Sequence, residues 1–524
     1  MTSRLRIPDW LLLLAFCGFF FLWKLSSFGL IGADEPRYAQ VAREMLARHD
    51  WITPTLGGLP WLEKPPLFYW QAMIAYQIFG VSDWAARLPS VFDASLLVFA
   101  VFWLLKRLRP LCALDGALML ACSAGIVGYA RAASMDMPLT ATFAIAMLAW
   151  YAWFQSASSL YLAAFYCSIA LALLAKGPVA PGLAGVIIVS FALVRRDWKI
   201  VWRTLWRPEL LLFFLIGLPW YVLVQLRNPQ FFRVFILEHN LARFSSNMFH
   251  HPEPFWYYIP VTLLGWVPWA VFVVAALVWT IRTFRKLDVD TLNIFLLIWV
   301  AVFVIFFSIS ESKLPGYVLP AIPPGIVLLA IYIHERAARK PHPLLVPLHA
   351  AVASALIFAA LLLPSFVLQH RVHWSVSLVV PLALALSIGV ALAVLLFRTG
   401  LAGLRIMTVV PAVITLALAI RLGAPALDIS LSARPVSEAL LRFAPGRLPV
   451  AVVLVPRETE FGLQFYCNQL KVARYELGEA PAGEHLVVAA QGFRNAFAKN
   501  VPGRNIVYLG RLPAQKLEFF EVGP

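Results

Sequence analysis

Acidic side chains that could act on a sugar, and basic side chains that could bind a phosphate, recur along the sequence. The acidic candidates are Asp34, Glu35, Glu63 and Asp136, and the candidates for binding are Lys64, Arg243, Lys313 and Tyr317. Carboxylates orient sugar hydroxyls, deprotonate an acceptor or stabilise positive charge at an oxocarbenium-like carbon. Lysine and arginine bind phosphate groups. Together, these residue types suit a site that separates a sugar from a phosphate.

Each carboxylate also has a purely structural interpretation. Asp34 and Glu35 precede a proline, which is typical of the first turn of a helix with an acid at the cap. Asp136 precedes a long apolar run and could cap a helix in the same way. Glu63 and Lys64 could form a surface ion pair, and such pairs contribute little to stability. Position alone leaves both interpretations open, so the elements that carry these residues must decide.

The composition predicts a membrane protein. Of the 524 residues, 61% are apolar and 13% are charged, which is about half the charge content of a soluble domain. This composition excludes a soluble multi-domain enzyme, a disordered chain and a nucleic-acid-binding module. About thirteen apolar runs have the length of membrane-spanning helices. They cover approximately residues 10–30, 88–105, 111–129, 137–154, 159–175, 178–194, 209–226, 256–280, 291–309, 318–334, 345–368, 376–397 and 404–422.

The net charge of +16 indicates the orientation of these spans. Lysine and arginine gather where the even-numbered runs end, at residues 106–109, 195–207, 282–286, 336–340 and 398–405. Because cytoplasmic loops retain basic residues, the N-terminus is expected inside and the segment after residue 422 outside. All the candidate residues then lie at one outer face. The predicted division is a membrane domain of residues 1–422 and an outer domain of residues 423–524.

The outer segments have recognisable local patterns. The first outer loop, residues 31–87, contains an amphipathic helix at 34–48 and a shorter apolar helix at 67–79, and both are expected to lie at the membrane interface. A second outer loop covers residues 228–255. The tail alternates short strands near 450–455, 471–477, 484–490 and 505–509 with helices near 435–443 and 459–468, which predicts a small α/β domain.

A metal site and a transport function are weaker interpretations. His250, His251 and Glu253 offer metal ligands, but their spacing matches no zinc pattern, so we expect local hydrogen bonds there and no required cofactor. A structural metal remains an alternative. A transporter or flippase for lipid-linked sugars would place ionisable groups near the membrane midplane and show paired repeats. Asp93 is the main acid inside a predicted span, and the sequence shows no repeat.

Several motifs, in this order, resemble a known family. They are Asp34-Glu35-x-Arg37-Tyr38-Ala39, Glu63-Lys64-Pro65-Pro66-Leu67-x-Tyr69-Trp70, Arg87-Leu88-Pro89, Lys176-Gly177-Pro178, Glu238-His239-x4-Arg243-Phe244 and Ser312-Lys313-Leu314-Pro315-x-Tyr317. Over residues 10–340 the chain is similar to the bacterial lipid A aminoarabinose transferases. These belong to the protein O-mannosyltransferase superfamily of GT-C glycosyltransferases.

The resemblance implies a GT-C fold, with about thirteen transmembrane helices, interfacial helices and a periplasmic α/β domain. It further implies a monomeric inner-membrane enzyme that transfers 4-amino-4-deoxy-L-arabinose from undecaprenyl phosphate to lipid A phosphate, with inversion and without a metal. Such a transfer is associated with polymyxin resistance. Related sugars and acceptors stay open, namely galacturonic acid, a mannose-type sugar, another outer-leaflet lipid or a protein hydroxyl.

The resemblance also suggests roles for individual residues. Lys64 and Arg243 match basic residues that hold the donor phosphate, and Tyr317 matches an aromatic residue of the same pocket. Lys313 and Glu35 are expected to bind substrate as well. The expected catalytic acids are Asp34, Asp136 and Glu63. A phosphate acceptor is already anionic and needs no base, whereas a hydroxyl acceptor requires one, so the role of Asp34 as a base stays open.

Overall fold

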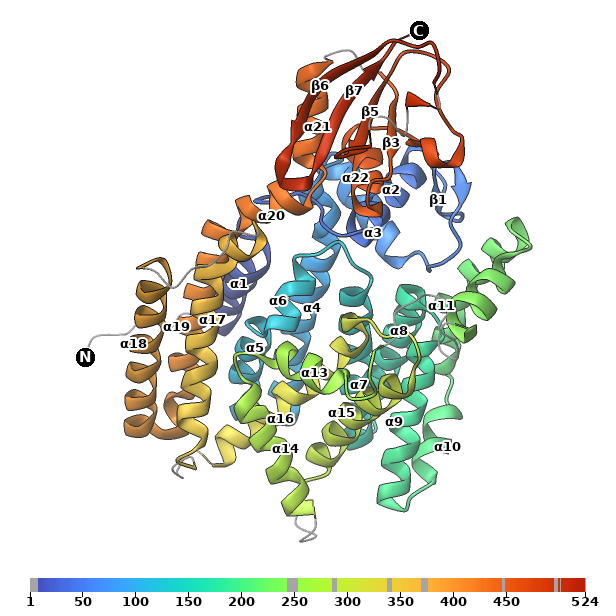
Figure 1. Ribbon diagram of the computed structural model, residues 1–524. Coiled ribbons are helices and arrows are strands. Elements are labelled where there is room, and N and C mark those ends of the chain that lie inside the picture. The colour runs from blue at the N-terminus through green and yellow to red at the C-terminus, as the bar shows by residue number, and fades with distance from the viewer. Residues whose placement is uncertain are drawn as a thin grey trace.

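The protein consists of a helical bundle with a small α/β domain at one end. The computed structural model describes residues 8–242, 253–284, 290–336, 342–368, 376–444, 448–493, 498–499 and 501–523. Figure 1 shows the α/β domain, coloured orange to red, stacked on the end of the bundle where the first loop lies. The bundle itself is formed by long helices that run roughly side by side.

Every apolar run predicted to span the membrane contains a helix or a bent helix pair. In the described residues, nine helices are long and apolar enough to cross a membrane, or up to eleven if each bent pair is one span. The nine are α4 (Asp83–Leu108), α7 (Asp136–Ser156), α8 (Ser159–Lys176), α11 (Leu210–Arg227), α15 (Thr291–Ile309), η4 with α16 (Pro315–Glu335), α17 (Leu345–Val367), Val379–Thr399 of α18 (Val376–Thr399), and Met407–Leu431, which joins most of α19 (Leu404–Leu418) to α20 (Ala424–Leu431). The chain is a multi-pass membrane protein.

The remaining apolar segments are bent or short. Pro110–Ala121, which includes α5 (Ala113–Ala121), meets α6 (Ala124–Ala130) at 58°, and α13 (Tyr258–Trp266) meets α14 (Ala270–Phe284) at 112°. Two shorter apolar segments are Asp9–Leu22, which begins with α1 (Asp9–Cys17), and α9 (Val179–Arg195). These four coincide with the other predicted runs. Thirteen crossings therefore stay a prediction, whereas the positions of the helices are confirmed.

Two helices form the centre of the bundle and begin near the same point. In α7, 89% of the apolar window is buried, and in the segment formed by η4 (Pro315–Ala321) and α16 (Ile322–Glu335) the share is 94%. Large side chains such as Phe143, Trp150 and Trp299 fill the space around them. Because α7 packs against η4, residue Asp136 at the start of α7 meets the Pro315–Tyr317 turn. Dense apolar packing thus places one candidate acid beside one candidate binding loop.

The first outer loop contains both predicted helices, and several polar side chains of the first helix are buried. Helix α2 (Asp34–Ala47) and helix α3 (Leu67–Phe79) pack together, and a short hairpin of β1 (Thr55–Leu56) and β2 (Leu59–Pro60) lies between them in sequence. Gln40 and Glu44 of α2 are buried. The Arg43 guanidinium donates to the Phe465 carbonyl oxygen at 2.7 Å. The C-terminal domain therefore covers part of the charged face of α2, a contact that the sequence did not predict, and the position of α2 at the membrane interface stays a prediction.

The C-terminal domain is a five-stranded mixed sheet flanked by helices. The strand order is β4 (Ala473–Arg474), β3 (Val450–Val453), β5 (His485–Ala490), β7 (Leu517–Val522) and β6 (Ile506–Leu512). Helices α21 (Arg434–Phe443) and α22 (Arg457–Tyr466) match the two predicted ones. The last long helical stretch continues to Leu431. The expected domain boundary at residue 423 thus falls within this helical stretch.

One buried arginine ties the first loop to the bundle. Arg87 of α4 has no exposed surface, and its guanidinium forms an ion pair with Glu35 at 2.7 Å. The same guanidinium donates to the carbonyl oxygens of Leu25, Phe28 and Gly29 at 3.1, 2.9 and 2.8 Å. A fully buried charge persists only when it is paired and hydrogen-bonded, and Arg87 meets both conditions.

The Glu35 carboxylate also binds two backbone groups. Its carboxylate accepts hydrogen bonds from the backbone N–H groups of Ile31 at 2.9 Å and Ala133 at 2.7 Å. The side chain is 8% exposed, and all of these partners are protein groups. We therefore assign Glu35 a structural role in place of the expected contact with substrate.

Replacing Arg87 tests this junction. Arg87→Ala leaves Glu35 buried without its countercharge, so we expect a loss of about 3–5 kcal/mol of stability. Thermal unfolding of the purified protein in detergent measures the change. Arg107→Ala on the same helix is the control, because Arg107 is exposed. Equal melting temperatures for the two variants would contradict the assignment.

Candidate active site

The two acids that the sequence offered as helix caps form ion pairs instead. Asp34 and Asp136 are the first residues of α2 and α7, and neither helix has a side-chain hydrogen bond at its cap. The Asp34 carboxylate pairs with Arg37, one turn later in α2, and remains 57% exposed. The Asp136 carboxylate pairs with Lys176, the last residue of α8. Both acids therefore sit beside a cation at the same end of the bundle.

Lys176 connects Asp136 to the Tyr317 turn. Its ammonium lies 4.7 Å from the centroid of the Tyr317 ring, a distance typical of a cation–π contact. The Ser134 hydroxyl donates to the second Asp136 oxygen at 3.1 Å. A Cβ atom at Gly316 would lie 2.5 Å from the Asp136 carboxyl carbon, so only glycine allows this close approach. Asp136 is thus held from three sides.

Two buried tyrosines show that three candidate acids form one electrostatic cluster. Burial raises the pKa of Tyr38, and the negative charges of Asp34 and Asp136 raise it further, against the opposing effect of Arg37. Burial also raises the pKa of Tyr69, to which the charges of Glu63 and Asp34 contribute. Asp34, Asp136 and Glu63 therefore act on neighbouring phenols in one region, as the predicted topology required.

The first and second outer loops also approach each other. The Glu63 carboxylate lies 3.7 Å from Nε2 of His239, which belongs to η3 (Phe232–Ala242). Lys64 follows Glu63 and is half-buried. Lys313 is buried, and its ammonium donates to the Ser310 carbonyl oxygen at 2.5 Å, next to the η4 turn. The two loops and the η4 turn therefore border the same end of α7.

The metal interpretation gains no support from the part of the chain that the structure covers. Arg243, His250 and His251 lie outside the described residues. Glu253 is described and is exposed. Within the described ranges, no group of three or more histidine, cysteine, aspartate or glutamate side chains could hold a metal ion.

Two cations of the cluster were missed as site residues. Arg37 and Lys176 occur in the sequence motifs, yet nothing in the pattern showed which acid each would meet. Arg37 lies three residues after Asp34, a spacing at which side chains meet on a helix, so its partner was available from the sequence. Lys176 meets Asp136 across 40 residues of sequence, and only the packing of α7 against α8 brings them together.

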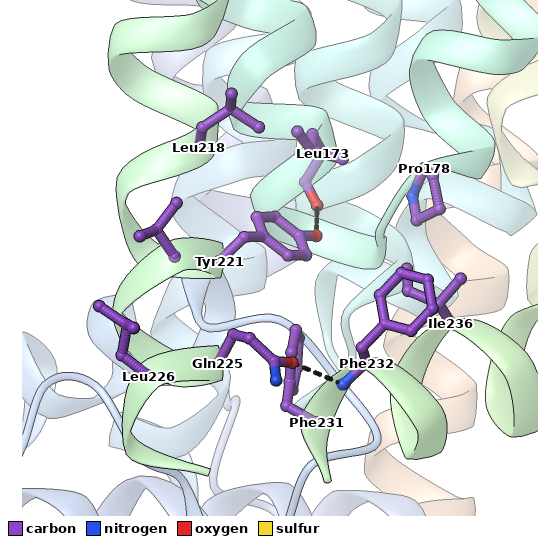
Figure 2. A pocket seen from close by; sticks show the side chains of 10 residues that line it. Leu173, Pro178, Leu218, Tyr221, Gln225, Leu226, Phe231, Phe232 and Ile236 are labelled. Atoms are coloured by element: carbon purple, nitrogen blue, oxygen red, sulfur yellow. Dashed lines mark hydrogen bonds between the residues drawn. The ribbon is translucent and has the colours of Figure 1, made fainter. Parts of the chain in front are cut away.

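An apolar groove of about 430 Å³ lies next to the C-terminal end of α8, which carries Lys176 (Figure 2). Its lining residues are Leu173, Pro178, Leu218, Tyr221, Val222, Gln225, Leu226, Phe231, Phe232 and Ile236. The Tyr221 hydroxyl donates to the Leu173 carbonyl oxygen at 2.9 Å and so joins α11 to α8. Pro178 is two residues beyond Lys176. The groove therefore lies between α8, α11 and η3, and Pro178 in its lining is close in sequence to the charged cluster.

The contribution of the Tyr69 hydroxyl to the stability of the protein can be tested. It is buried and has no hydrogen-bond partner among the described residues. Tyr69→Phe should therefore keep or raise the melting temperature, because no hydrogen bond is lost. The matched control is Tyr76→Phe on the same helix, whose hydroxyl donates to the Ala39 carbonyl oxygen at 3.2 Å. That control should lose about 1 kcal/mol. A similar loss for Tyr69→Phe would mean that its hydroxyl is already satisfied.

Comparison with known proteins gives relatives for part of the sequence. Residues 10–235 match the family model of the dolichyl-phosphate-mannose-protein mannosyltransferases. An undecaprenyl phosphate-alpha-4-amino-4-deoxy-L-arabinose arabinosyl transferase of Erwinia tasmaniensis is 32% identical over 61% of this chain and 58% of its own length. The protein of the same name from Edwardsiella ictaluri is 31% identical over 63% and 60%. The chain thus matches less than two thirds of these curated relatives.

Comparison of structures covers almost the whole chain. The crystal structure of ArnT from Cupriavidus metallidurans bound to undecaprenyl phosphate has a TM-score of 0.79 and 22% sequence identity, covering 98% of this chain and 97% of the other. The apo structure of the same protein gives a TM-score of 0.76. At this identity, the likeness establishes the fold. The resemblance to the aminoarabinose transferases that the motifs indicate is thereby confirmed, in sequence over 61% of the chain and in fold over 98% of it.

Proposed function

We propose that the protein is an inverting glycosyltransferase that moves 4-amino-4-deoxy-L-arabinose from undecaprenyl phosphate to a lipid A phosphate. The observation that carries this proposal is the convergence of the Asp34, Glu63 and Asp136 carboxylates with cations beside an apolar groove. Such a site accommodates a phosphate, a sugar and a lipid tail at once. The names of the sequence relatives and the undecaprenyl phosphate bound to ArnT support the same substrate.

The reaction breaks one bond and forms one bond at the anomeric carbon. As the bond to the donor phosphate oxygen breaks, negative charge grows on the leaving phosphate, and cations fixed in place stabilise it. We assign this role to Lys64 and Arg243, with Tyr317 against the same phosphate. An oxygen of the acceptor phosphate forms the new bond from the opposite side, which inverts the anomeric centre.

The two pairs of acid and cation suggest different roles for the acids. Asp136 is held by Lys176 and by Ser134, so it is suited to orienting the sugar rather than to taking up a proton. Asp34 is 57% exposed, with Arg37 as its partner. Because the acceptor phosphate is already anionic, we assign Asp34 to the positive charge of the amino sugar and of the oxocarbenium-like carbon.

The apolar groove suits the polyprenyl chain of the donor. Its lining is apolar apart from Gln225 and the Tyr221 hydroxyl, and the latter is already bonded. Several of its residues on α11, including Leu218 and Val222, are 40% and 54% exposed, on a helix that is mostly unburied within the protein. A lipid chain can therefore enter from the side. We further propose that the site lies at the periplasmic face of the inner membrane, with a cytoplasmic N-terminus, a periplasmic C-terminal domain and a single chain as the working unit, an orientation that the basic residues of the opposite loops support.

The direct test is transfer by the purified protein. Incubation with undecaprenyl phosphate aminoarabinose and lipid A should release undecaprenyl phosphate and raise the mass of lipid A by one aminoarabinose residue. Parallel reactions with a polyprenyl-phosphate galacturonic acid or mannose donor identify the preferred sugar. Release of undecaprenyl phosphate without a change in the mass of lipid A would contradict the proposed acceptor.

Two substitutions separate catalysis from donor binding. Asp34→Asn should lower kcat by about a hundredfold or more with donor affinity retained, because it removes charge stabilisation at the reacting carbon. Lys64→Ala should weaken the binding of undecaprenyl phosphate by about tenfold or more, because a charged hydrogen bond is lost. Turnover assays and a binding titration measure the two effects. An Asp34→Asn protein with undiminished turnover would refute the role of Asp34.

Narrowing the groove tests its occupant. Leu218→Trp should raise the KM for the undecaprenyl donor by about tenfold, because overpacking an apolar site costs about 1–3 kcal/mol. A donor analogue with one or two isoprene units should be unaffected. Leu215→Trp is the control, because Leu215 is 70% exposed on the same helix and does not line the groove. Equal effects on long and short donors would show that the tail binds elsewhere.

A further inference from the structure

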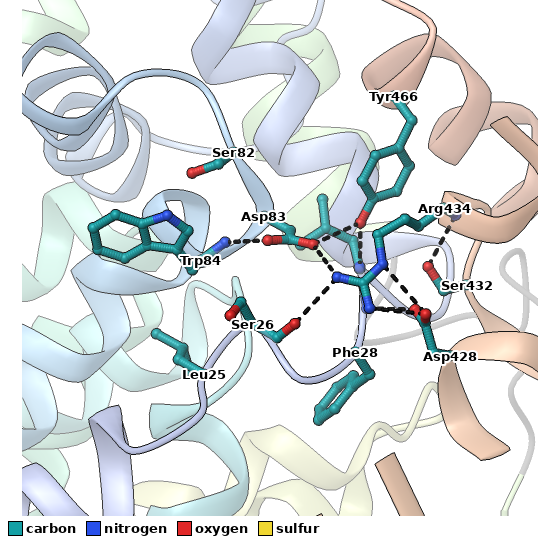
Figure 3. A network of polar contacts seen from close by, with 12 residues as sticks. Leu25, Ser26, Phe28, Ser82, Asp83, Trp84, Asp428, Ser432, Arg434 and Tyr466 are labelled. Carbon is teal, nitrogen blue, oxygen red and sulfur yellow. Dashed lines mark hydrogen bonds and ion pairs between the residues drawn. The ribbon is translucent and has the colours of Figure 1, made fainter. Parts of the chain in front are cut away.

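Residues 26–31 form the loop that leads into α2. Side chains of the C-terminal segment, which we define as residues 424–523, bind the backbone of this loop (Figure 3). The Asp428 carboxylate accepts from the Gly29 N–H at 2.7 Å, and the Tyr466 hydroxyl accepts from the Leu30 N–H at 2.7 Å. The Arg434 guanidinium donates to the Ser26 carbonyl oxygen at 3.1 Å. One side chain from the end of the last long helical stretch, Asp428, and two from beyond it, Arg434 and Tyr466, thus bind one short segment.

These three side chains are themselves joined into a network. Arg434 pairs with Asp428 at 2.8 Å and with Asp83, the first residue of α4, at 3.0 Å. The Tyr466 hydroxyl lies 3.4 Å from the same Asp83 oxygen. The three charged side chains are between 10% and 24% exposed, so water screens them weakly. Figure 3 shows Arg434 between its two carboxylates, with Tyr466 above Asp83.

The fit at Gly29 leaves no room for a side chain. An added Cβ atom would lie 2.3 Å from the Ser432 hydroxyl oxygen and 2.5 Å from the Tyr466 hydroxyl oxygen. Ser432 and Ile31 also form an isolated antiparallel bridge. The C-terminal segment therefore contacts this backbone directly, at the distance of a sheet neighbour.

The opposite side of the same segment leads to both candidate acids. Arg87 binds the carbonyl oxygens of residues 25, 28 and 29, and Glu35 binds the Ile31 N–H. Glu35 also binds the Ala133 N–H, three residues before Asp136, and it directly follows Asp34 in the chain. The segment is thus clamped between the C-terminal network and the junction that places Asp34 and Asp136.

We propose that the C-terminal domain is a positioning part of the active site, acting through Asp428, Arg434 and Tyr466 on residues 26–31. By holding this segment against Arg87 and Glu35, the network keeps Asp34 and Asp136 at the spacing that the reaction requires. The proposal rests on the transferase function given above. Neither Arg434 nor Tyr466 needs to touch a substrate for this role.

The test uses single-atom and single-charge changes in the full-length protein. Tyr466→Phe removes only the hydroxyl that accepts from Leu30, and Arg434→Gln removes the charge between the two carboxylates. Both should lower kcat by about tenfold to a hundredfold, as expected for a small displacement of reacting groups. The Kd for undecaprenyl phosphate should stay unchanged, since these residues lie away from the donor phosphate.

A matched control separates positioning from simple domain stability. Tyr475 packs in the core of the same domain, with its hydroxyl 2.5 Å from Nε2 of His485. Tyr475→Phe removes a buried hydroxyl without touching residues 26–31, and it should leave kcat unchanged. Hydrogen exchange gives a readout that is independent of activity. Backbone N–H groups in residues 26–35 and 131–136 should exchange faster in Tyr466→Phe than in the wild type or in Tyr475→Phe.

The outcomes distinguish this proposal from the proposed function. Wild-type kcat and wild-type exchange in Tyr466→Phe would overturn the positioning role, even if Arg434→Gln failed to fold. If Tyr466→Phe and the control Tyr475→Phe lowered kcat equally, the effect would reflect domain stability, and the positioning role would be overturned as well. If the wild-type protein transferred no sugar, the proposed function would fail, and exchange at residues 131–136 would still decide whether the network controls the segment before Asp136.

Discussion

The buried ion pair between Arg87 and Glu35 is the constraint on which the outer end of the molecule depends. A guanidinium with no exposed surface must find an acceptor for each donor, and here the acceptors are one carboxylate and three backbone carbonyl groups. The chain before α2 therefore has to wrap around Arg87. The carboxylate in turn fixes the turn before α7 through the Ala133 N–H. One charged pair thus sets the relative position of two loops that are about a hundred residues apart in sequence.

The long helices and the tail could be predicted from the sequence because segments that are buried or face lipid are rich in apolar residues. Apolar runs located every span-like helix, and short runs of strand-forming residues between the predicted helices located four of the five strands of the C-terminal sheet. Strand β7 was missed, since Phe519 and Phe520 are adjacent and interrupt the alternation of Leu517–Val522. Both phenylalanines are buried, because both faces of this strand are covered. Glu518 and Glu521 also divide its apolar residues, so β7 shows neither a continuous apolar run nor a strict alternation.

The burial and the ion-pair partners of neighbouring polar residues could not be predicted. Asp34 and Glu35 are adjacent and chemically alike, yet one is exposed beside Arg37 and the other is buried against Arg87. Successive residues on a helix point about a quarter turn apart, and only tertiary packing decides which direction faces a cavity. The same limit applies to α2 as a whole. A polar helix face looks identical in sequence whether it meets water, lipid headgroups or, as here, another domain.

The side opening of the apolar groove between α8, α11 and η3 has a consequence for how the donor would reach the site. A groove lined by half-exposed leucine and valine side chains exchanges its contents with the bilayer and not with the aqueous phase. Occupancy then depends on the mole fraction of the donor among the surrounding lipids, because the ligand diffuses in two dimensions. Diluting the membrane with inert lipid would empty the groove even when the amount of donor per volume of suspension is constant.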